Sequence, residues 1–121
     1  MQSNMMHEPQ IFVKFSINCD LTKPGQVIKL TGSSPRLGNW NLRYGFTMHT
    51  SASEFPNWNS DPHFNVADLL KGMSSPHLEY KYVIVGDSSN SSFEPIWENI
   101  DGNRILNLKA RPTDGSNTIN K

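Results

Sequence analysis

The sequence predicts an all-β domain, a sandwich or a barrel, and three observations lead to this fold class. Apolar residues recur at every second position over residues 11–17 and 80–85, which is the period of a β-strand. Turn-forming Gly, Pro, Asn, Asp and Ser residues separate such runs. Helix signals are weak, since the chain has only three alanines and no sustained helical spacing of apolar residues. Short strands joined by turns are typical of sandwiches and barrels.

The expected elements follow one another with turn signals between them. The predicted strands cover residues 11–17, 26–31, 80–85 and 105–108, where β-branched, aromatic and other apolar side chains gather. Weaker strand candidates are residues 43–49 and 64–69, and residues 68–71 are a candidate for a single helical turn. The clearest strand is residues 80–85.

The length of 121 residues fits one domain with one core. We expect residues 10–109 to form the β domain, because the predicted strands lie there. Residues 1–9 are polar and are expected to be a flexible N-terminus, and residues 110–121 are expected to be a linker-like tail. This organisation predicts a module of a longer protein.

The charge balance argues against several partners. Eleven basic and eleven acidic residues give a formal net charge of zero, so we expect no nucleic-acid partner, which would favour a basic excess. Apolar runs are only a few residues long, so we expect no membrane partner. The first ten residues lack the apolar core of a signal peptide, and a cytoplasmic location is therefore expected.

No metal or other cofactor is predicted. Cys19 is the only cysteine, which excludes an internal disulfide and is too few for a zinc site built on thiolates. The four histidines are far apart and form no spaced ligand pair. Cys19 is therefore interpreted as a small, buried or partly buried residue near a strand end.

The three tryptophans are the candidate binding residues. Trp40, Trp58 and Trp97 each lie among polar or turn-forming residues, although burial in the core is the usual fate of tryptophan. An exposed indole can stack on the apolar face of a sugar ring, whose hydroxyls pair with Asn, Glu or Lys side chains. A covered ring face of about 100 Å² would contribute ~2.5 kcal/mol. Two such faces offset an association cost of at least ~4 kcal/mol, which predicts roughly micromolar to millimolar affinity.

Three strings of residues occur in an order that resembles a known family. They are residues 27–33 with Leu37-Gly38-Asn39-Trp40, then Glu79-Tyr80-Lys81-Tyr82-Val83-Ile84, then Trp97-Glu98 followed by Asn103-Arg104. Over residues 10–108 the chain resembles carbohydrate-binding module family 20, the starch-binding domain family. The resemblance implies an immunoglobulin-like antiparallel β-sandwich of seven to eight strands that binds α-1,4-glucan, with cyclodextrins as compact mimics.

The resemblance also implies a main binding site. Its carbohydrate-binding residues would be Trp40, Lys81, Trp97, Glu98 and Asn103. Simpler interpretations remain for three of them. Lys81 would be a solvated strand residue, Glu98 would pair with Arg104, and Asn103 would be a turn residue.

A second site, which some members of the family build on tyrosines, is doubtful from the sequence. The position of its first aromatic residue falls near Pro24, and proline cannot stack in the same way. Trp58 is the possible second-site residue, and its alternative is a packing residue of the core or of a loop.

The function expected for this chain is non-catalytic binding of starch, glycogen, maltooligosaccharides or cyclodextrin through two exposed tryptophans. The expected partners are the α-glucan and an attached catalytic domain that this module would target to polysaccharide. An enzymatic role is not expected, because the chain carries no Gly-x-Ser-x-Gly, Cys/His or phosphate-binding glycine motif and is too small for a deep cleft with paired carboxylates. The alternative is a protein-interaction domain of the same fold with weak or no glycan binding.

Overall fold

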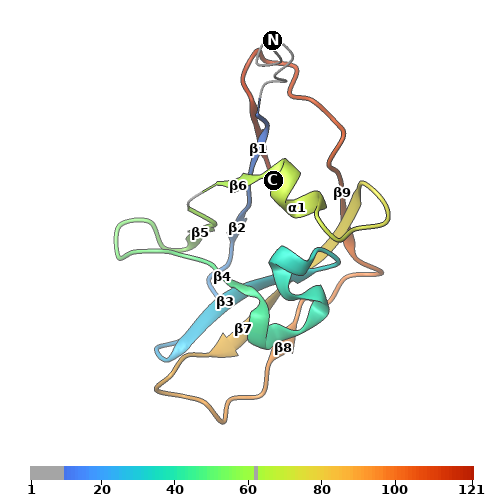
Figure 1. The fold of residues 1–121 in the computed structure, drawn as a ribbon. Helices are drawn as coiled ribbons and strands as arrows, with labels where there is room; N and C mark the ends of the chain where they lie inside the picture. The colour runs from blue at the N-terminus through green and yellow to red at the C-terminus, as the bar shows by residue number, and fades with distance from the viewer. Residues whose placement is uncertain (1–9, 62) are drawn as a thin grey trace, which may run out of the picture.

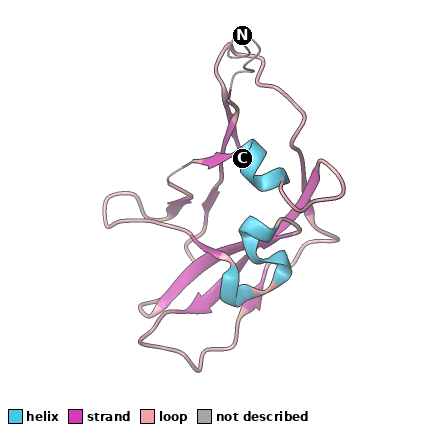
Figure 2. Cartoon of the chain, viewed as in Figure 1, coloured by secondary structure: helices cyan, strands magenta, loops and turns pink. Residues whose placement is uncertain are grey.

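The structure is a computed structural model that describes residues 10–61 and 63–121 (Figure 1). The predicted flexible segment 1–9 lies outside the described residues. Strands and loops dominate, with a few short helices (Figure 2). The strands are β1 (Phe12–Lys14), β2 (Ser16–Asn18), β3 (Gln26–Gly32), β4 (Phe46–Thr47), β5 (Asn57–Asn59), β6 (Phe64–Asn65), β7 (His77–Gly86), β8 (Ile96–Trp97), β9 (Arg104–Asn107) and β10 (Thr118–Asn120). The helices are η2 (Pro35–Trp40), η3 (Leu42–Tyr44) and α1 (Val66–Leu70).

The large sheet has the order β4-β3-β7-β8, and β9 also pairs with β7. Its centre is the antiparallel pair β3 and β7, whose register runs from Gln26 opposite Gly86 to Gly32 opposite Tyr80. Two smaller sheets, β10-β1-β6 and β2-β5, form the second layer. The predicted all-β sandwich is confirmed, although the described residues form ten strands rather than seven to eight, and several of these strands are only two or three residues long.

The core lies between the large sheet and the strands β1 and β2. Alternate residues of β7 (Leu78, Tyr80, Tyr82 and Ile84) belong to one buried cluster with Phe15. The rings of Phe15 and Tyr80 meet edge to face, with their centroids 5.1 Å apart. Burying each such side chain stabilises the fold by about 1.5–3 kcal/mol, so the period of two in β7 directly sets the core.

The predicted strand over residues 11–17 is interrupted at Phe15. Its backbone N–H donates to the Ser60 hydroxyl at 2.9 Å, and this contact separates β1 from β2. The two pieces then pair with different partners, β6 and β5. Alternation of apolar residues continues through the break because Val13 and Phe15 both point into the core.

The weaker strand predictions were wrong in part. Residues 64–69 form a strand only at Phe64 and Asn65, after which α1 begins. The Asn65 side chain caps this helix by accepting a hydrogen bond from Ala67 N at 2.8 Å. Val66 and Leu69 are both buried, which is the three-residue spacing of a helical face. Similarly, residues 43–49 contain the end of η3 and the two-residue β4.

The tail over residues 110–121 is not a simple linker, and this corrects the sequence prediction. Residues Thr118–Asn120 form β10, which pairs in parallel with β1 from Phe12 to Lys14. Lys121 N donates to Lys14 O at 2.8 Å, and Ile119 packs against the core. Main-chain hydrogen bonds along a sheet edge require no particular side chain, so the polar composition of this segment did not reveal the strand.

Candidate functional site

One face of the large sheet carries most of the predicted site, and we call it the outer face because it points away from the core. Residues of β7 alternate between the core and this face, so Glu79, Lys81 and Val83 lie on the outer face. Trp97 of β8 is directly opposite Val83 in the register. Directly opposite residues place their side chains on the same side of a sheet. Lys81 and Trp97 therefore share the outer face.

The segment containing Trp40 is fastened across the same face. The Thr31 hydroxyl donates to Leu37 O at 2.9 Å, and Lys29 Nζ donates to Leu42 O at 2.8 Å. In the β3–β7 register Thr31 is opposite Lys81, and Lys29 is opposite Val83. Helices η2 and η3 consequently pack on β3 (Figure 1). They do so at the residue pairs of the sheet that include Lys81 and, through Val83, Trp97.

The backbone around Trp40 is left-handed over three residues. The φ angles are 84° at Gly38, 51° at Asn39 and 69° at Trp40. Such angles are uncommon for residues other than glycine and are often found at functional sites. A Cβ at Gly38 would lie 2.7 Å from the carbonyl carbon of Tyr44, so only glycine fits there. The buried Leu37 anchors this turn, which leaves Trp40 partly buried.

Trp97 and Asn103 complete the outer face. Trp97 is 41% exposed on an edge strand of two residues. Asn103 immediately precedes β9, and its Nδ2 donates to Glu79 Oε1 at 2.9 Å. Since Ile105 is opposite Glu79, the alternation along β9 also places Asn103 on this side. The structure thus gathers Lys81, Trp97 and Asn103 on one face, beside the segment of Trp40.

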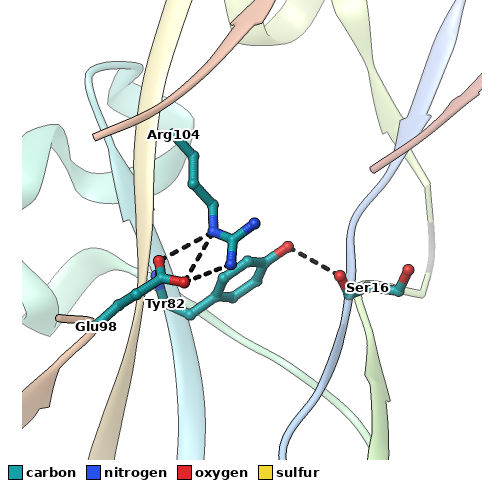
Figure 3. A network of polar contacts seen from close by, with 4 residues as sticks. All are labelled: Ser16, Tyr82, Glu98 and Arg104. Carbon is teal, nitrogen blue, oxygen red and sulfur yellow. Dashed lines mark hydrogen bonds and ion pairs between the residues drawn. The ribbon is translucent and has the colours of Figure 1, made fainter. Parts of the chain in front are cut away.

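Glu98 differs from the other predicted site residues because its carboxylate is held by the protein (Figure 3). Arg104 Nε donates to both carboxylate oxygens, at 3.0 Å to Oε1 and 2.9 Å to Oε2. Tyr82 N also donates to Oε1 at 3.2 Å. The Glu98 side chain is only 12% exposed. The Glu98 side chain is therefore the partner of Arg104, as the alternative interpretation expected.

The same network links both layers of the sandwich. The Arg104 guanidinium lies 5.2 Å from the centre of the Tyr82 ring, on the core side of the sheet. The Tyr82 hydroxyl donates to Ser16 O at 3.3 Å, across to β2 (Figure 3). Hydrogen bonding to Glu98 raises the pKa of Arg104, and burial raises the pKa of Tyr82. The network therefore ties β7, β8 and β9 together on the core side of the sheet, at the residue that follows Trp97.

Trp58 is a core residue, which corrects its assignment as a second-site candidate. It lies in β5, is 4% exposed and belongs to the buried cluster. Its indole N–H donates to Cys19 O at 3.2 Å, which satisfies the polar atom inside the core. A ring this buried offers no face to a sugar.

Three neighbours of the site were not predicted from the sequence. Glu79 orients Asn103, while Lys29 and Thr31 fasten the Trp40 segment. Each of the three residues alternates with apolar residues along its strand, and this pattern could have assigned them to the face away from the core. Within residues 10–61 and 63–121, no three His, Cys, Asp or Glu side chains gather in a way that could hold a metal ion. No helix in this part of the chain is long and apolar enough to cross a membrane.

Comparison with protein families gives a match over nearly the whole chain. The family model described as starch binding domain matches residues 10–118. The 4-alpha-glucanotransferase DPE2 of Oryza sativa subsp. japonica is 29% identical over 92 residues, covering 75% of this chain and 9% of that protein. The cyclomaltodextrin glucanotransferase of Bacillus sp. (strain 1-1) is 26% identical over 112 residues, covering 91% of this chain and 14% of that protein. The chain thus spans a small part of the curated relatives it matches.

Solved structures show the same fold. Gamma-CGTase from Bacillus clarkii superposes with a TM-score of 0.62 at 26% identity, covering 93% of this chain and 14% of that one. The family 20 carbohydrate-binding module of the maltotetraose-forming amylase from Pseudomonas saccharophila has a TM-score of 0.55 at 17% identity. That superposition covers 92% of this chain and 100% of the module, so the two share the sandwich fold.

Proposed function

The chain belongs to the starch-binding domain family, whose members are non-catalytic binding modules, and from that premise we propose that its outer face binds α-1,4-glucan through Trp40 and Trp97. The observation that carries this proposal is the register of the large sheet. This register aligns Lys81 and Trp97 on one face. The hydrogen bond from Thr31, which is opposite Lys81, holds the Trp40 segment on the same face. Two indoles beside a cation and an amide suit a ligand with apolar ring faces and many hydroxyls.

Each residue has a distinct role in this proposal. Trp97 offers the more exposed ring face, and Trp40 offers a second one held by its left-handed backbone. Lys81 and Asn103 donate to sugar hydroxyls. Glu98 supports the site from below, because its carboxylate is engaged by Arg104.

The experiment is a calorimetric titration with β-cyclodextrin. We expect saturable binding by the wild-type protein at roughly micromolar to millimolar concentration, and its loss in Trp40→Ala and Trp97→Ala. Phe55→Ala is the matched control, since Phe55 is 44% exposed but lies in the loop before β5. Circular dichroism of every variant establishes that it is folded.

The titration also separates this proposal from the alternative function. If the folded wild-type protein binds neither β-cyclodextrin nor glycogen nor amylopectin, the glucan site is refuted, and a protein-interaction domain becomes the better hypothesis. If binding survives both tryptophan substitutions, the glucan lies elsewhere on the molecule.

We further propose that this module acts together with a glucan-metabolising catalytic domain. The support is that the matched relatives are named as glucanotransferases and are many times longer than the matched region. A weak module attached to an enzyme raises the local concentration of polysaccharide. The test is to compare such an enzyme with and without this domain on starch granules and on a short soluble maltooligosaccharide. Only activity on granules should depend on the domain.

A cytoplasmic location remains a prediction.

A further inference from the structure

We infer that the outer face also carries a subsite for a phosphate monoester on the glucan, formed by Arg43, Lys29 and Ser91. This inference rests on the proposed glucan site and specifies the class of polysaccharide that the site prefers. It is carried by the distribution of charge, by a hollow beside the site and by N–H groups of Arg43 and Lys29 that have no hydrogen-bond partner among the described residues.

The charges of this neutral chain are unevenly distributed. Residues 21–53 include four Lys or Arg residues and no Asp or Glu, so all eleven acidic residues lie outside this segment. The same segment contains β3, η2 and η3, which form the proposed glucan site with β7 and β8. On the outer face, Glu79 accepts a hydrogen bond from Asn103, while the Glu98 carboxylate lies on the core side with Arg104. The region around Trp40 is therefore locally basic.

Two of these cations meet in a hollow on the outer face. The hollow has a volume of about 230 Å³, and its lining includes Lys29, Arg43, Ser91 and Phe93. Its acidic neighbours along the chain are Asp87, which follows Gly86, and the exposed Glu94, and neither is part of the lining. The Asp87 carboxylate accepts hydrogen bonds from the Ser89 backbone N–H and hydroxyl. A hollow lined by two cations and a hydroxyl suits a compact anion.

The register places this hollow within reach of the tryptophan site. Lys29 is opposite Val83, and Val83 is opposite Trp97, so one rung of the sheet joins the hollow to the indole. Neighbouring strands are ~4.8 Å apart, which puts the Lys29 and Trp97 backbones roughly 10 Å apart. A glucan chain stacked on Trp97 can therefore present a substituent of a neighbouring sugar to the hollow.

The donors in the hollow have capacity for a ligand. Lys29 Nζ has three donors and gives one to Leu42 O. In the described part of the chain the Arg43 side chain makes neither a hydrogen bond nor an ion pair, and its guanidinium lies 5.9 Å from the centre of the Tyr44 ring. Neutral glucan has no charge to match these cations, whereas a phosphate monoester accepts charge-assisted hydrogen bonds from both.

The experiment uses one amylopectin in two forms, phosphorylated and enzymatically dephosphorylated, with β-cyclodextrin titrated in parallel. We expect the wild-type protein to bind the phosphorylated form about fivefold more tightly, the size of effect that one exposed ion pair provides. Arg43→Gln should remove this preference and leave β-cyclodextrin binding unchanged, while Arg43→Lys should retain part of it. Arg36→Gln is the matched control, because Arg36 is exposed in η2 but does not line the hollow.

Salt and free phosphate identify the source of the preference. At about 0.5 M NaCl the Debye length is only ~4 Å, so the preference should disappear while β-cyclodextrin binding persists. Inorganic phosphate should compete only weakly, because the tryptophans hold the sugar to which the phosphate is attached.

Several outcomes would overturn the subsite. These are equal affinity for the two amylopectins, a preference that survives Arg43→Gln, or an equal loss in Arg36→Gln, which would indicate a diffuse basic field. If the wild-type protein binds neither β-cyclodextrin nor either amylopectin, the tryptophan site itself is refuted. The two failures are therefore distinguishable.

Discussion

The strands β5 and β8 make an instructive pair, because each is a short strand that presents one tryptophan. Trp58 follows Pro56 and Asn57, and Trp97 follows Pro95 and Ile96. In β5 the indole points into the core and is 4% exposed, whereas in β8 it points to the outer face and is 41% exposed. The difference arises from pairing. Trp58 lies opposite Ile17, which packs against the core, and Trp97 lies opposite Val83 on the outer face of the large sheet.

This comparison separates stability from binding in one residue type. The indole of Trp58 fills space and donates a hydrogen bond within the core, so it stabilises the fold. The indole of Trp97 retains a free face, so it is available to a ligand. Substitutions at Trp58 and Trp97 should therefore affect different properties, stability for the first and binding for the second.

Trp58→Ala should destabilise the domain by about 3–5 kcal/mol, because it opens a cavity and leaves Cys19 O without its donor. The measurement is urea unfolding followed by circular dichroism. Trp58→Phe, which keeps much of the volume, is the control and should lose less. An unfolding free energy within ~0.5 kcal/mol of wild type in Trp58→Ala would contradict the core role.

Trp97→Ala should weaken glucan binding and leave the stability of the domain nearly unchanged. Loss of a stacked face of about 100 Å² removes ~2.5 kcal/mol of binding free energy, while the unfolding free energy should change by less than about 0.5 kcal/mol, as for other surface positions. Calorimetry with β-cyclodextrin and urea unfolding of the same protein measure the two effects. If stability falls and binding persists, the contrast between β5 and β8 is wrong.

Arg104→Ala should destabilise the domain by roughly 1.5–3 kcal/mol, since it removes the charge-assisted hydrogen bonds of a largely buried carboxylate. Glucan binding should weaken by a smaller factor than in Trp97→Ala, because Arg104 acts on β8 through Glu98. The double variant Glu98→Gln/Arg104→Gln should recover part of the stability, as no charge is then left unpaired. Greater loss in the double variant than in Arg104→Ala would refute this explanation.

Alkaline pH should weaken the domain through Tyr82. Burial raises its pKa above the ordinary value of 10.0, so the folded state retains a proton that the unfolded state releases. The resulting stability is fully present below about pH 10 and is lost as pH rises further, with a slope of up to ~1.4 kcal/mol per pH unit for one group. Tyr82→Phe should flatten this slope in urea unfolding measured between pH 9 and about pH 11. Tyr80, whose pKa burial also raises, would account for a slope that remains.

The sequence alone predicted the fold class, which the structure confirms, and it predicted which residues of the central strand share a face. The alternation in residues 80–85 identified the central strand, and the same alternation separated the core residue Tyr82 from Lys81 on the other face. The polar and turn-forming residues around Trp40 indicated a turn, and the structure adds that only glycine fits at position 38. These features depend on local sterics and on strand period, which are properties of the chain itself.

Only the tertiary structure decided which tryptophan is buried and what Glu98 contacts. Both outcomes depend on partners distant in the sequence: Ile17 for Trp58, and Tyr82 for Glu98. The pairing of β10 with β1 was likewise hidden, because main-chain hydrogen bonds leave no mark in side-chain composition. The local sequence determines which residues share a face of a strand, but only long-range packing determines which of the two faces is exposed to solvent.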